Sequence, residues 1–295
     1  MASRTKNATR NIIWGICYKI TMLLLPFAVR TVMIYTLGSQ YLGLNSLFTS
    51  VLDVLSLAEL GVGSAMVYAM YRPIAEEDTE IVCALLNLYK KIYRMIGGFI
   101  AVIGLILLPF IRNFISGDVP KDINIYILFF VYIVNTSGSY FLFAYKSSIL
   151  NASQRNDIAS KVNMVTGIVK YIMQIVVLLF WHNYYGYVIV IPITSFAANI
   201  IIAYTAKKMY PQYICKGNVK PELIKEIKGK VFALFAVKIT SVIYNSVDSI
   251  VISAFLGLIV LAKYNNYYYI LSAIISIVTV VFTSITSSIG NSIVL

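Results

Sequence analysis

The sequence is poor in the residue types on which most catalytic and metal sites depend. Its 295 residues include one histidine and three cysteines, and Cys17, Cys83 and Cys215 are too far apart to form a metal-binding or redox motif. We therefore expect no metal site, no cofactor and no enzymatic activity. Charged residues are scarce as well, at 12% of the chain, whereas an ordinary soluble domain has about a quarter.

Apolar residues take the place of the missing charge. They make up 59% of the chain, the mean hydropathy is +0.81, and apolar runs longer than about 18 residues recur along the whole length. The sequence predicts an all-α polytopic membrane protein with about eight transmembrane helices. The candidate spans are residues 11–37, 41–71, 81–112, 123–149, 157–182, 186–206, 231–256 and 264–290.

The basic residues predict the orientation of these spans. The net charge of +12 could suggest nucleic acid as a partner, but the cations are distributed as membrane topology requires. With the N-terminus in the cytoplasm, seventeen of the 24 Lys and Arg residues fall in cytoplasmic segments and three fall outside. We therefore expect a cytoplasmic N-terminus and no nucleic-acid partner. Four cations remain at membrane depth, namely Lys19, Arg30, Lys170 and Lys238.

A basic loop over residues 207–230 divides the chain into a six-helix first lobe, 1–206, and the first two helices of a second lobe, 231–295. A shift of 219 residues places Lys19-Ile20-Thr21 on Lys238-Ile239-Thr240 and Leu37-Gly38 on Leu256-Gly257. Internal repeats are common in transporters, whose binding sites lie between the repeated halves. In this register the second lobe ends after its second helix, so the sequence predicts a truncated form.

The intramembrane cations are candidate substrate ligands. Lys19 and Arg30 are eleven residues apart, so on a straight helix they lie within about 20° of one face and roughly 16 Å apart. They could line a cavity or extend to the two membrane interfaces. Pro26 lies between them and would free a backbone carbonyl. Lys238 repeats Lys19 in the second lobe, and for Lys170 cavity and interface positions are equally expected.

Three carboxylates also lie in apolar segments. Asp53 and Glu59 are about 240° apart around a helix, so each is expected to meet a different partner. Asp248 either compensates an intramembrane cation or couples transport to protons or sodium. Glu59 precedes Gly61 and Gly63, which favour a close approach between helices. Most of the twenty-three tyrosines are expected at interfaces, although aromatic rings in a cavity would also stack on sugar rings.

Two stretches carry a resemblance to a known family. YLGLNSLFTSVLDVLSLAELGVGSA, followed by MYRPIAEED and LYKKIYRMIG, resembles the second helix, first cytoplasmic loop and third-helix start of Wzx-type flippases. SSILNASQRNDIASKVN, at residues 147–163, is similar to the loop between helices four and five of that family. These bacterial proteins export lipid-linked oligosaccharides and share a superfamily with MATE multidrug exporters. The resemblance covers the whole chain and is most specific over residues 41–98.

The resemblance implies two helical bundles around a central cavity that opens alternately to each side of a bacterial cytoplasmic membrane. It implies that the first and seventh helices place Lys19, Arg30, Lys238 and Asp248 in that cavity. The implied substrate is a polyprenyl pyrophosphate carrying a sugar repeat, of the O-antigen (lipopolysaccharide) or capsule type. The implied partners are membrane lipids, a glycan polymerase and other assembly proteins.

Three other functions stay open at the level of sequence. A cation-coupled drug exporter would need an acidic cavity, and drug-exporting relatives typically hold a carboxylate on the first helix, where this chain has Lys19 and Arg30. A non-transporting fragment or scaffold of a glycan assembly complex is consistent with the predicted truncation. An integral-membrane glycosyltransferase is disfavoured because no carboxylate cluster occurs in a sizeable outer loop.

Overall fold

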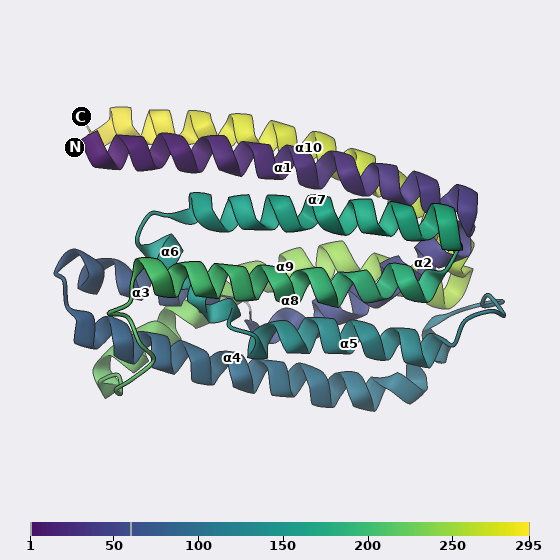
Figure 1. The fold of residues 1–295 in the computed structure, drawn as a ribbon, viewed down its shortest axis with the longest axis horizontal. Helices are drawn as coiled ribbons and strands as arrows, with labels where there is room; N and C mark the ends of the chain where they lie inside the picture. Colours follow the sequence, from purple (N-terminus) through teal and green to yellow (C-terminus); the bar gives the residue numbers. More distant parts are fainter. Residues whose placement is uncertain (1, 60, 295) are drawn as a thin grey trace.

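Helices make up the fold, and they run side by side along its long axis (Figure 1). The computed structural model describes the backbone of residues 2–59 and 61–294, and the side chains of residues 9–57, 59, 61–235, 239–240, 242–243 and 246–276. No strand occurs within the described backbone. The predicted all-α class is therefore confirmed.

The helices occupy all eight predicted ranges, with short 3-10 segments, labelled η, between some of them. The elements are α1 (Ala2–Thr36), α2 (Ser39–Leu55), η1 (Ser56–Glu59), α3 (Val62–Ala75), α4 (Thr79–Leu107), η2 (Leu108–Phe114), α5 (Ile125–Phe141), η3 (Ala144–Lys146), α6 (Ser147–Ala152), α7 (Asn156–Trp181), α8 (Tyr184–Met209), α9 (Pro221–Leu256) and α10 (Leu258–Val294).

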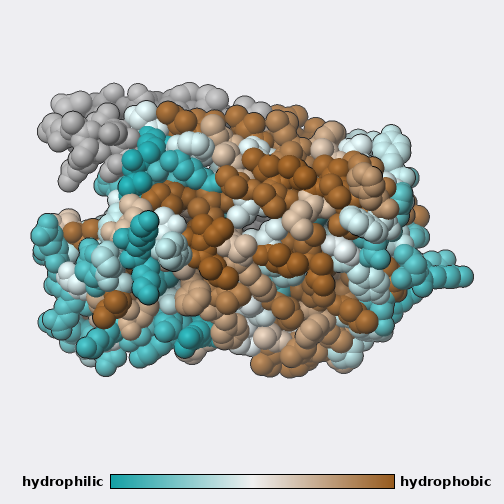
Figure 2. Space-filling view, viewed as in Figure 1, coloured by the Kyte–Doolittle hydropathy of each residue, from teal (hydrophilic) through white to brown (hydrophobic). Residues whose placement is uncertain are grey.

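Several of these helices have the length and composition of membrane spans. Among the described residues, four helices are long and apolar enough to cross a bilayer, and a fifth joins them if the bent pair of Ile125–Phe141 and Ala144–Ala152 is one span. Hydrophobic residues form a broad central band on the face seen in Figure 2, whereas hydrophilic residues gather at the two ends. This surface is typical of a polytopic membrane protein.

The connections fall at the two ends of the helical bundle. The start of α1 and the α3–α4, α6–α7 and α8–α9 connections lie at one end, on the left of Figure 1. We call it the basic end, because Arg72, Arg155, Lys216 and Lys220 lie in or beside these connections. The α1–α2, α7–α8 and α9–α10 connections lie at the opposite end.

Two predicted helices are interrupted. The range 41–71 breaks between α2 and α3, where η1 is followed by Gly61 with a φ of +88°. A Cβ atom at Gly61 would lie 2.9 Å from the Val231 carbonyl oxygen of α9, so only glycine fits both the backbone angle and the close approach. The range 123–149 bends by 45° between α5 and the η3–α6 segment, beside Phe143, whose φ is +63°.

The 219-residue repeat is visible in two helix ends. Gly38 follows α1 with a φ of +108°, and Gly257 follows α9 with a φ of +84°. The Gly38 N–H donates to the Met33 carbonyl at 3.1 Å, and the Gly257 N–H donates to the Ile252 carbonyl at 3.0 Å. Both bonds have the spacing of a Schellman helix end. The two turns are therefore equivalent in the register that the Leu-Gly pairs predict.

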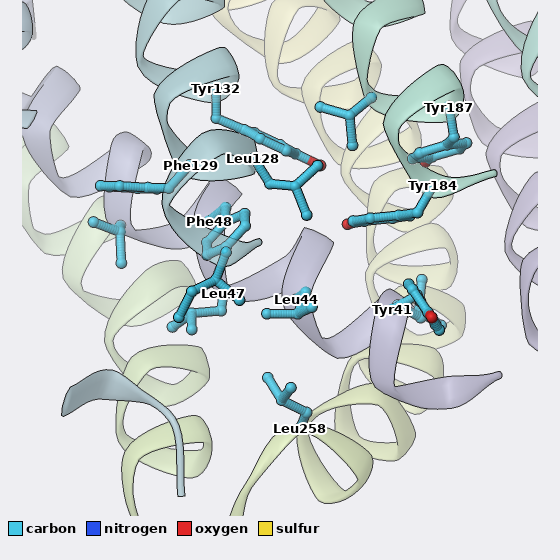
Figure 3. Close-up of a cluster of buried hydrophobic side chains, with 14 of the residues drawn as sticks. Tyr41, Leu44, Leu47, Phe48, Leu128, Phe129, Tyr132, Tyr184, Tyr187 and Leu258 are labelled. Atoms are coloured by element: carbon cyan, nitrogen blue, oxygen red, sulfur yellow. The ribbon is translucent and has the colours of Figure 1, made fainter. Parts of the chain in front are cut away.

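The largest buried cluster surrounds α2 (Figure 3). Phe48 of α2 packs against the Phe129 ring of α5 at 5.3 Å between ring centroids. Leu258, at the start of α10, packs into the same cluster. A Cβ atom at Gly43 of α2 would lie 2.3 Å from the Leu258 carbonyl oxygen. The missing side chain at this position therefore lets α2 and α10 meet.

An ion cluster fixes α1 against α7 at the basic end. The Asp157 side chain is 0% exposed and forms ion pairs with the Arg10 Nε at 2.9 Å, the Arg155 Nε at 3.0 Å and the Lys161 Nζ at 3.5 Å. The Asp157 backbone N–H also donates to the Asn11 side-chain oxygen at 2.8 Å. Three cations offset the cost of burying one carboxylate, so the start of α1 is held on the first turn of α7.

Candidate functional site

A cavity of about 390 Å³ lies among α1, α2, α5, α7 and α8, and we call it the cationic cavity. Its lining is mostly polar, because amide, hydroxyl and charged side chains from all five helices face it. The lining residues are Pro26, Val29, Arg30, Asn45, Thr49, Leu52, Asp53, Tyr132, Asn135, Thr136, Lys170, Tyr171, Gln174, Tyr187 and Ile191.

Arg30 reaches this cavity from the last third of α1. It is half-buried, and its guanidinium lies 4.8 Å from the centre of the Tyr269 ring of α10, a cation–π distance. One of its nitrogens donates to the Asn265 carbonyl of α10 at 3.4 Å. These contacts leave most of the five guanidinium N–H donors for another ligand. Arg30 therefore lines the cavity and contacts α10 at once.

Tyr269 also compensates for the proline in α1. Pro26 has no N–H, so the Met22 carbonyl loses its helical hydrogen bond, and the proline ring crowds the same carbonyl. The Tyr269 hydroxyl donates to the Leu23 carbonyl at 2.5 Å and lies 3.5 Å from the Met22 carbonyl. The Met22 carbonyl, which Pro26 was predicted to free, therefore lies within hydrogen-bond distance of the Tyr269 hydroxyl of α10.

Lys170 supplies a second cation from the middle of α7. It is half-buried, and its Nζ lies 4.1 Å from the centre of the neighbouring Tyr171 ring. Lys170 also lines an adjoining cavity of about 310 Å³, which shares Asn135 and Ile191 with the first. Among the described residues, no carboxylate oxygen lies within 4.0 Å of the Arg30 or Lys170 nitrogens.

Asp53 faces the same cavity from α2, so two cations and one carboxylate line it. A charge at membrane depth is costly without a partner, and such residues usually mark a substrate or ion pathway. The planar fork of Arg30 can bind two oxygens of a phosphate, and Lys170 adds a point charge. The arrangement is chemically suited to an anion that several hydrogen-bond donors can surround.

A second and larger cavity, of about 1020 Å³, lies at the basic end, and we call it the tyrosine cavity. Elements α1, η1, α3, α4 and α6, the α6–α7 connection and the start of α7 form it. Its lining residues are Asn11, Glu59, Gly61, Gly63, Ser64, Val67, Tyr68, Tyr71, Tyr89, Tyr93, Ser147, Ser148, Asn151, Gln154 and Asn156. The lining that the described residues form therefore includes one carboxylate and no lysine, arginine or histidine.

The structure separates the predicted site residues into groups. Arg30, Lys170 and Asp53 meet in the cationic cavity, whereas Glu59 lies in the tyrosine cavity. Lys19 is exposed on α1, and Asp248 is exposed on α9, where its carboxylate accepts a hydrogen bond from the Tyr264 hydroxyl at 2.8 Å.

Neither Lys19 nor Asp248 lines the cationic cavity, the cavity of about 310 Å³ beside it or the tyrosine cavity. Lys238 lies in α9, and its side chain is outside the described residues.

Sequence reasoning missed Asp157, Asn265 and Tyr269. The signal for Asp157 was available, because an acidic residue in the first turn of a helix with a lysine four residues later is typical of an ion-paired helix start. No comparable signal singled out Tyr269 among the twenty-three tyrosines. Its role follows from the packing of α10 against α1, through contacts 246 residues apart in sequence.

No group of three or more His, Cys, Asp or Glu side chains that could hold a metal ion occurs in the described part of the chain. In comparisons with known proteins, a family model described as polysaccharide biosynthesis protein matches residues 8–286. No curated protein and no solved structure matches the chain.

Proposed function

The chain belongs to the polysaccharide biosynthesis protein family, and we propose that it is a flippase for lipid-linked oligosaccharide. In this proposal the substrate is a polyprenyl pyrophosphate that carries a sugar repeat. The protein moves it from the cytoplasmic to the outer leaflet without making or breaking a covalent bond, so it acts as a transporter and not as an enzyme.

The observation that carries this proposal is the pair of cations in one membrane-depth cavity. Arg30 and Lys170 line the cationic cavity, with no carboxylate oxygen within 4.0 Å among the described residues. A pyrophosphate would receive charge-assisted hydrogen bonds from both side chains, which are roughly twice as strong as bonds between neutral groups. Asp53 then reduces the excess positive charge of the empty cavity.

Alternating access supplies the proposed mechanism. Arg30 belongs to the first lobe, but it contacts Asn265 and Tyr269 of α10 in the second lobe. Rocking of one lobe against the other would change these contacts, and the cavity would open first to one side of the membrane and then to the other. A bound pyrophosphate would compete with the Asn265 carbonyl for the Arg30 donors and so link substrate binding to the motion of α10.

The charge distribution supports an orientation. Arg72, Arg155, Lys216 and Lys220 lie in or beside the connections at the basic end, so we place this end, with the N-terminus, in the cytoplasm of a bacterial cell. The proposed location is the cytoplasmic membrane. The proposed partners are the lipid-linked oligosaccharide, membrane lipids, and a glycan polymerase with other assembly proteins that act on the exported repeat.

The test is complementation of a strain that lacks the gene. Deletion is expected to cause polyprenyl-pyrophosphate oligosaccharide to accumulate on the cytoplasmic side and surface polysaccharide to be lost. The wild-type chain is expected to reverse both effects, and Arg30→Ala to reverse neither while it reaches the membrane at wild-type level. Lys263→Ala, which removes an exposed cation from α10, is the matched control and is expected to behave as wild type.

Two results would contradict the proposal. The first is full complementation by Arg30→Ala, which would remove the cationic cavity from the mechanism. The second is a deletion strain with normal lipids but higher sensitivity to cationic drugs, which would favour the cation-coupled exporter. In that case Asp53, the one carboxylate among the described residues that line the cationic cavity, would be the first residue to replace.

A further inference from the structure

The tyrosine cavity has a lining that the cationic cavity does not share. Four tyrosines, Tyr68, Tyr71, Tyr89 and Tyr93, line it together with serine hydroxyls and side-chain amides. Glu59 is the one charged residue in the described lining, so the lining itself offers a phosphate no cation. Amides, hydroxyls and aromatic rings are instead the groups that fit a neutral molecule with many hydroxyls.

One wall of the tyrosine cavity is a chain of hydrogen bonds that ends on Glu59. The Tyr89 hydroxyl donates to the Tyr93 hydroxyl at 2.7 Å, and the Tyr93 hydroxyl donates to Glu59 Oε1 at 2.5 Å. The Tyr140 hydroxyl donates to Glu59 Oε2 at 2.6 Å. All three hydroxyl protons are therefore used within the wall, and the remaining lone pairs of Tyr89 and Glu59 can accept hydrogen bonds from hydroxyl donors in the cavity.

Packing holds this wall in place before any ligand binds. The Tyr89 and Tyr93 rings are buried and lie edge to face, with centroids 4.4 Å apart. Gly63 of α3 faces them, and a Cβ atom there would lie only 3.1 Å from the Tyr89 hydroxyl oxygen. The missing side chain therefore leaves room for the hydroxyl. A preorganised set of acceptors binds a ligand with little loss of conformational entropy.

Other residues of the lining offer side-chain amides and exposed rings. Asn151 and Asn156 make no side-chain hydrogen bond within the described residues, and each amide can donate and accept at once. Tyr71 is 47% exposed, and its ring can cover the apolar face of a sugar. The Tyr68 ring lies next to the Tyr71 ring, with 6.3 Å between the centroids. The Lys230 Nζ lies 3.9 Å from the centre of the Tyr68 ring.

The tyrosine cavity lies close to the cationic cavity along the chain. Asp53 lines the cationic cavity and Glu59 lines the tyrosine cavity, and the helical rise over the six positions from one to the other is roughly 10 Å. We propose that the tyrosine cavity binds the uncharged saccharide part of the lipid-linked substrate. This inference rests on the proposed function, because the substrate must carry both a pyrophosphate and a glycan.

The experiment measures two binding reactions of the purified full chain in detergent. One probe is farnesyl pyrophosphate, which has the charged group but no sugar. The other is a set of uncharged oligosaccharides obtained by hydrolysis of the host cell's surface polysaccharide. The test variant combines Tyr71→Ala with Asn151→Ala, and the matched control is Tyr204→Ala, which removes a 68% exposed tyrosine of α8 that does not line the tyrosine cavity.

The double variant is expected to bind the oligosaccharides about tenfold more weakly and farnesyl pyrophosphate as tightly as wild type. Tyr204→Ala is expected to bind both probes as wild type. Unchanged oligosaccharide binding by the double variant would overturn the inference, as would a wild-type chain that binds farnesyl pyrophosphate but no oligosaccharide. If the wild type binds oligosaccharide but not farnesyl pyrophosphate, the pyrophosphate site of the proposed function fails and the saccharide site stands.

Discussion

The two cavities differ most in the charge of their walls. Among the described residues, two cations and one carboxylate line the cationic cavity, whereas one carboxylate and no cation line the tyrosine cavity. The two cavities share two helices: α1 and α7 carry Arg30 and Lys170 to the first, and Asn11 of α1 and Asn156 at the start of α7 line the second. One bundle therefore presents two kinds of chemistry at two heights.

This difference indicates how a substrate with two unlike parts could be held. A pyrophosphate requires fixed positive charge in a place from which water is largely excluded. A glycan requires many weak hydrogen bonds and apolar faces, and the charge that serves the pyrophosphate would add little to its binding. Because the two cavities have separate walls, each can be tested alone. A substitution that weakens binding in one cavity should leave binding in the other unchanged.

The largest expected effect comes from the structure that the two cavities share. Asp157→Ala removes the buried carboxylate that pairs with Arg10, Arg155 and Lys161. Loss of this partner is expected to lower the free energy of unfolding by about 3 kcal/mol, because three cations lose their counter-charge. Thermal unfolding in detergent measures this loss of stability. The control is Glu76→Ala, which removes an exposed ion pair with Arg72 and should change the free energy of unfolding by less than about 1 kcal/mol.

Because α1 and α7 then separate at the basic end, binding of both probes is expected to weaken together. A variant as stable as wild type would show that the ion cluster does not fix these helices.

A charge reversal should affect one cavity alone. Arg30→Glu gives the cationic cavity two carboxylates and one cation, so farnesyl pyrophosphate binding is expected to weaken by about 100-fold while oligosaccharide binding stays within about twofold. Arg30→Lys keeps the charge but loses the planar fork, and it is expected to weaken farnesyl pyrophosphate binding by about tenfold. Equal losses for both probes would mean that the two cavities do not act independently.

Glu59→Gln is expected to have the opposite effect, because it should weaken binding at the tyrosine cavity and leave the cationic cavity unchanged. An amide nitrogen replaces one of the two carboxylate oxygens, so one of the Tyr93 and Tyr140 hydroxyls loses the oxygen to which it donates. The wall of the tyrosine cavity also loses its negative charge. Oligosaccharide binding is expected to weaken by about tenfold, with farnesyl pyrophosphate binding unchanged. Glu77→Gln, in the α3–α4 connection, is the control for the loss of a carboxylate. An unchanged oligosaccharide affinity would exclude Glu59 from the site.

The smallest effect is expected at the contact between α10 and α1. Tyr269→Phe removes the hydrogen bond to the Leu23 carbonyl but keeps the ring beside Arg30. The free energy of unfolding is expected to fall by about 1 kcal/mol, the usual contribution of one hydrogen bond, and farnesyl pyrophosphate binding to change by less than about threefold. A larger loss of binding would show that the hydroxyl, and not the ring, positions Arg30.

The sequence was sufficient to predict the fold class and some of the residues that line the cationic cavity. Apolar runs predicted the helices, and the cost of intramembrane charge singled out Arg30, Lys170 and Asp53 as candidate site residues. Their meeting in one cavity could not be predicted, because they lie on three helices whose packing depends on contacts far apart in sequence. Pro26 predicted a free carbonyl at Met22, but only the path of α10 shows that the Tyr269 hydroxyl lies 3.5 Å from it.

Helical geometry alone did not decide which of the two cations on α1 lines the cavity. Lys19 and Arg30 lie on nearly the same face of an ideal helix, yet Lys19 is exposed and Arg30 is half-buried. The angle around a helix does not say which helix covers that face at each height, and the two positions are separated by roughly 16 Å. The tyrosine cavity was out of reach for the same reason, since it combines residues from α1 to the start of α7.

The most direct test of the central claim uses the intact substrate. Lipid-linked oligosaccharide, extracted from the strain that lacks the gene, is titrated against the purified wild-type chain beside farnesyl pyrophosphate and the free oligosaccharide. If both cavities hold one molecule, the intact substrate is expected to bind at least about tenfold more tightly than either part, because the second contact becomes intramolecular. Binding no tighter than that of farnesyl pyrophosphate would contradict the account.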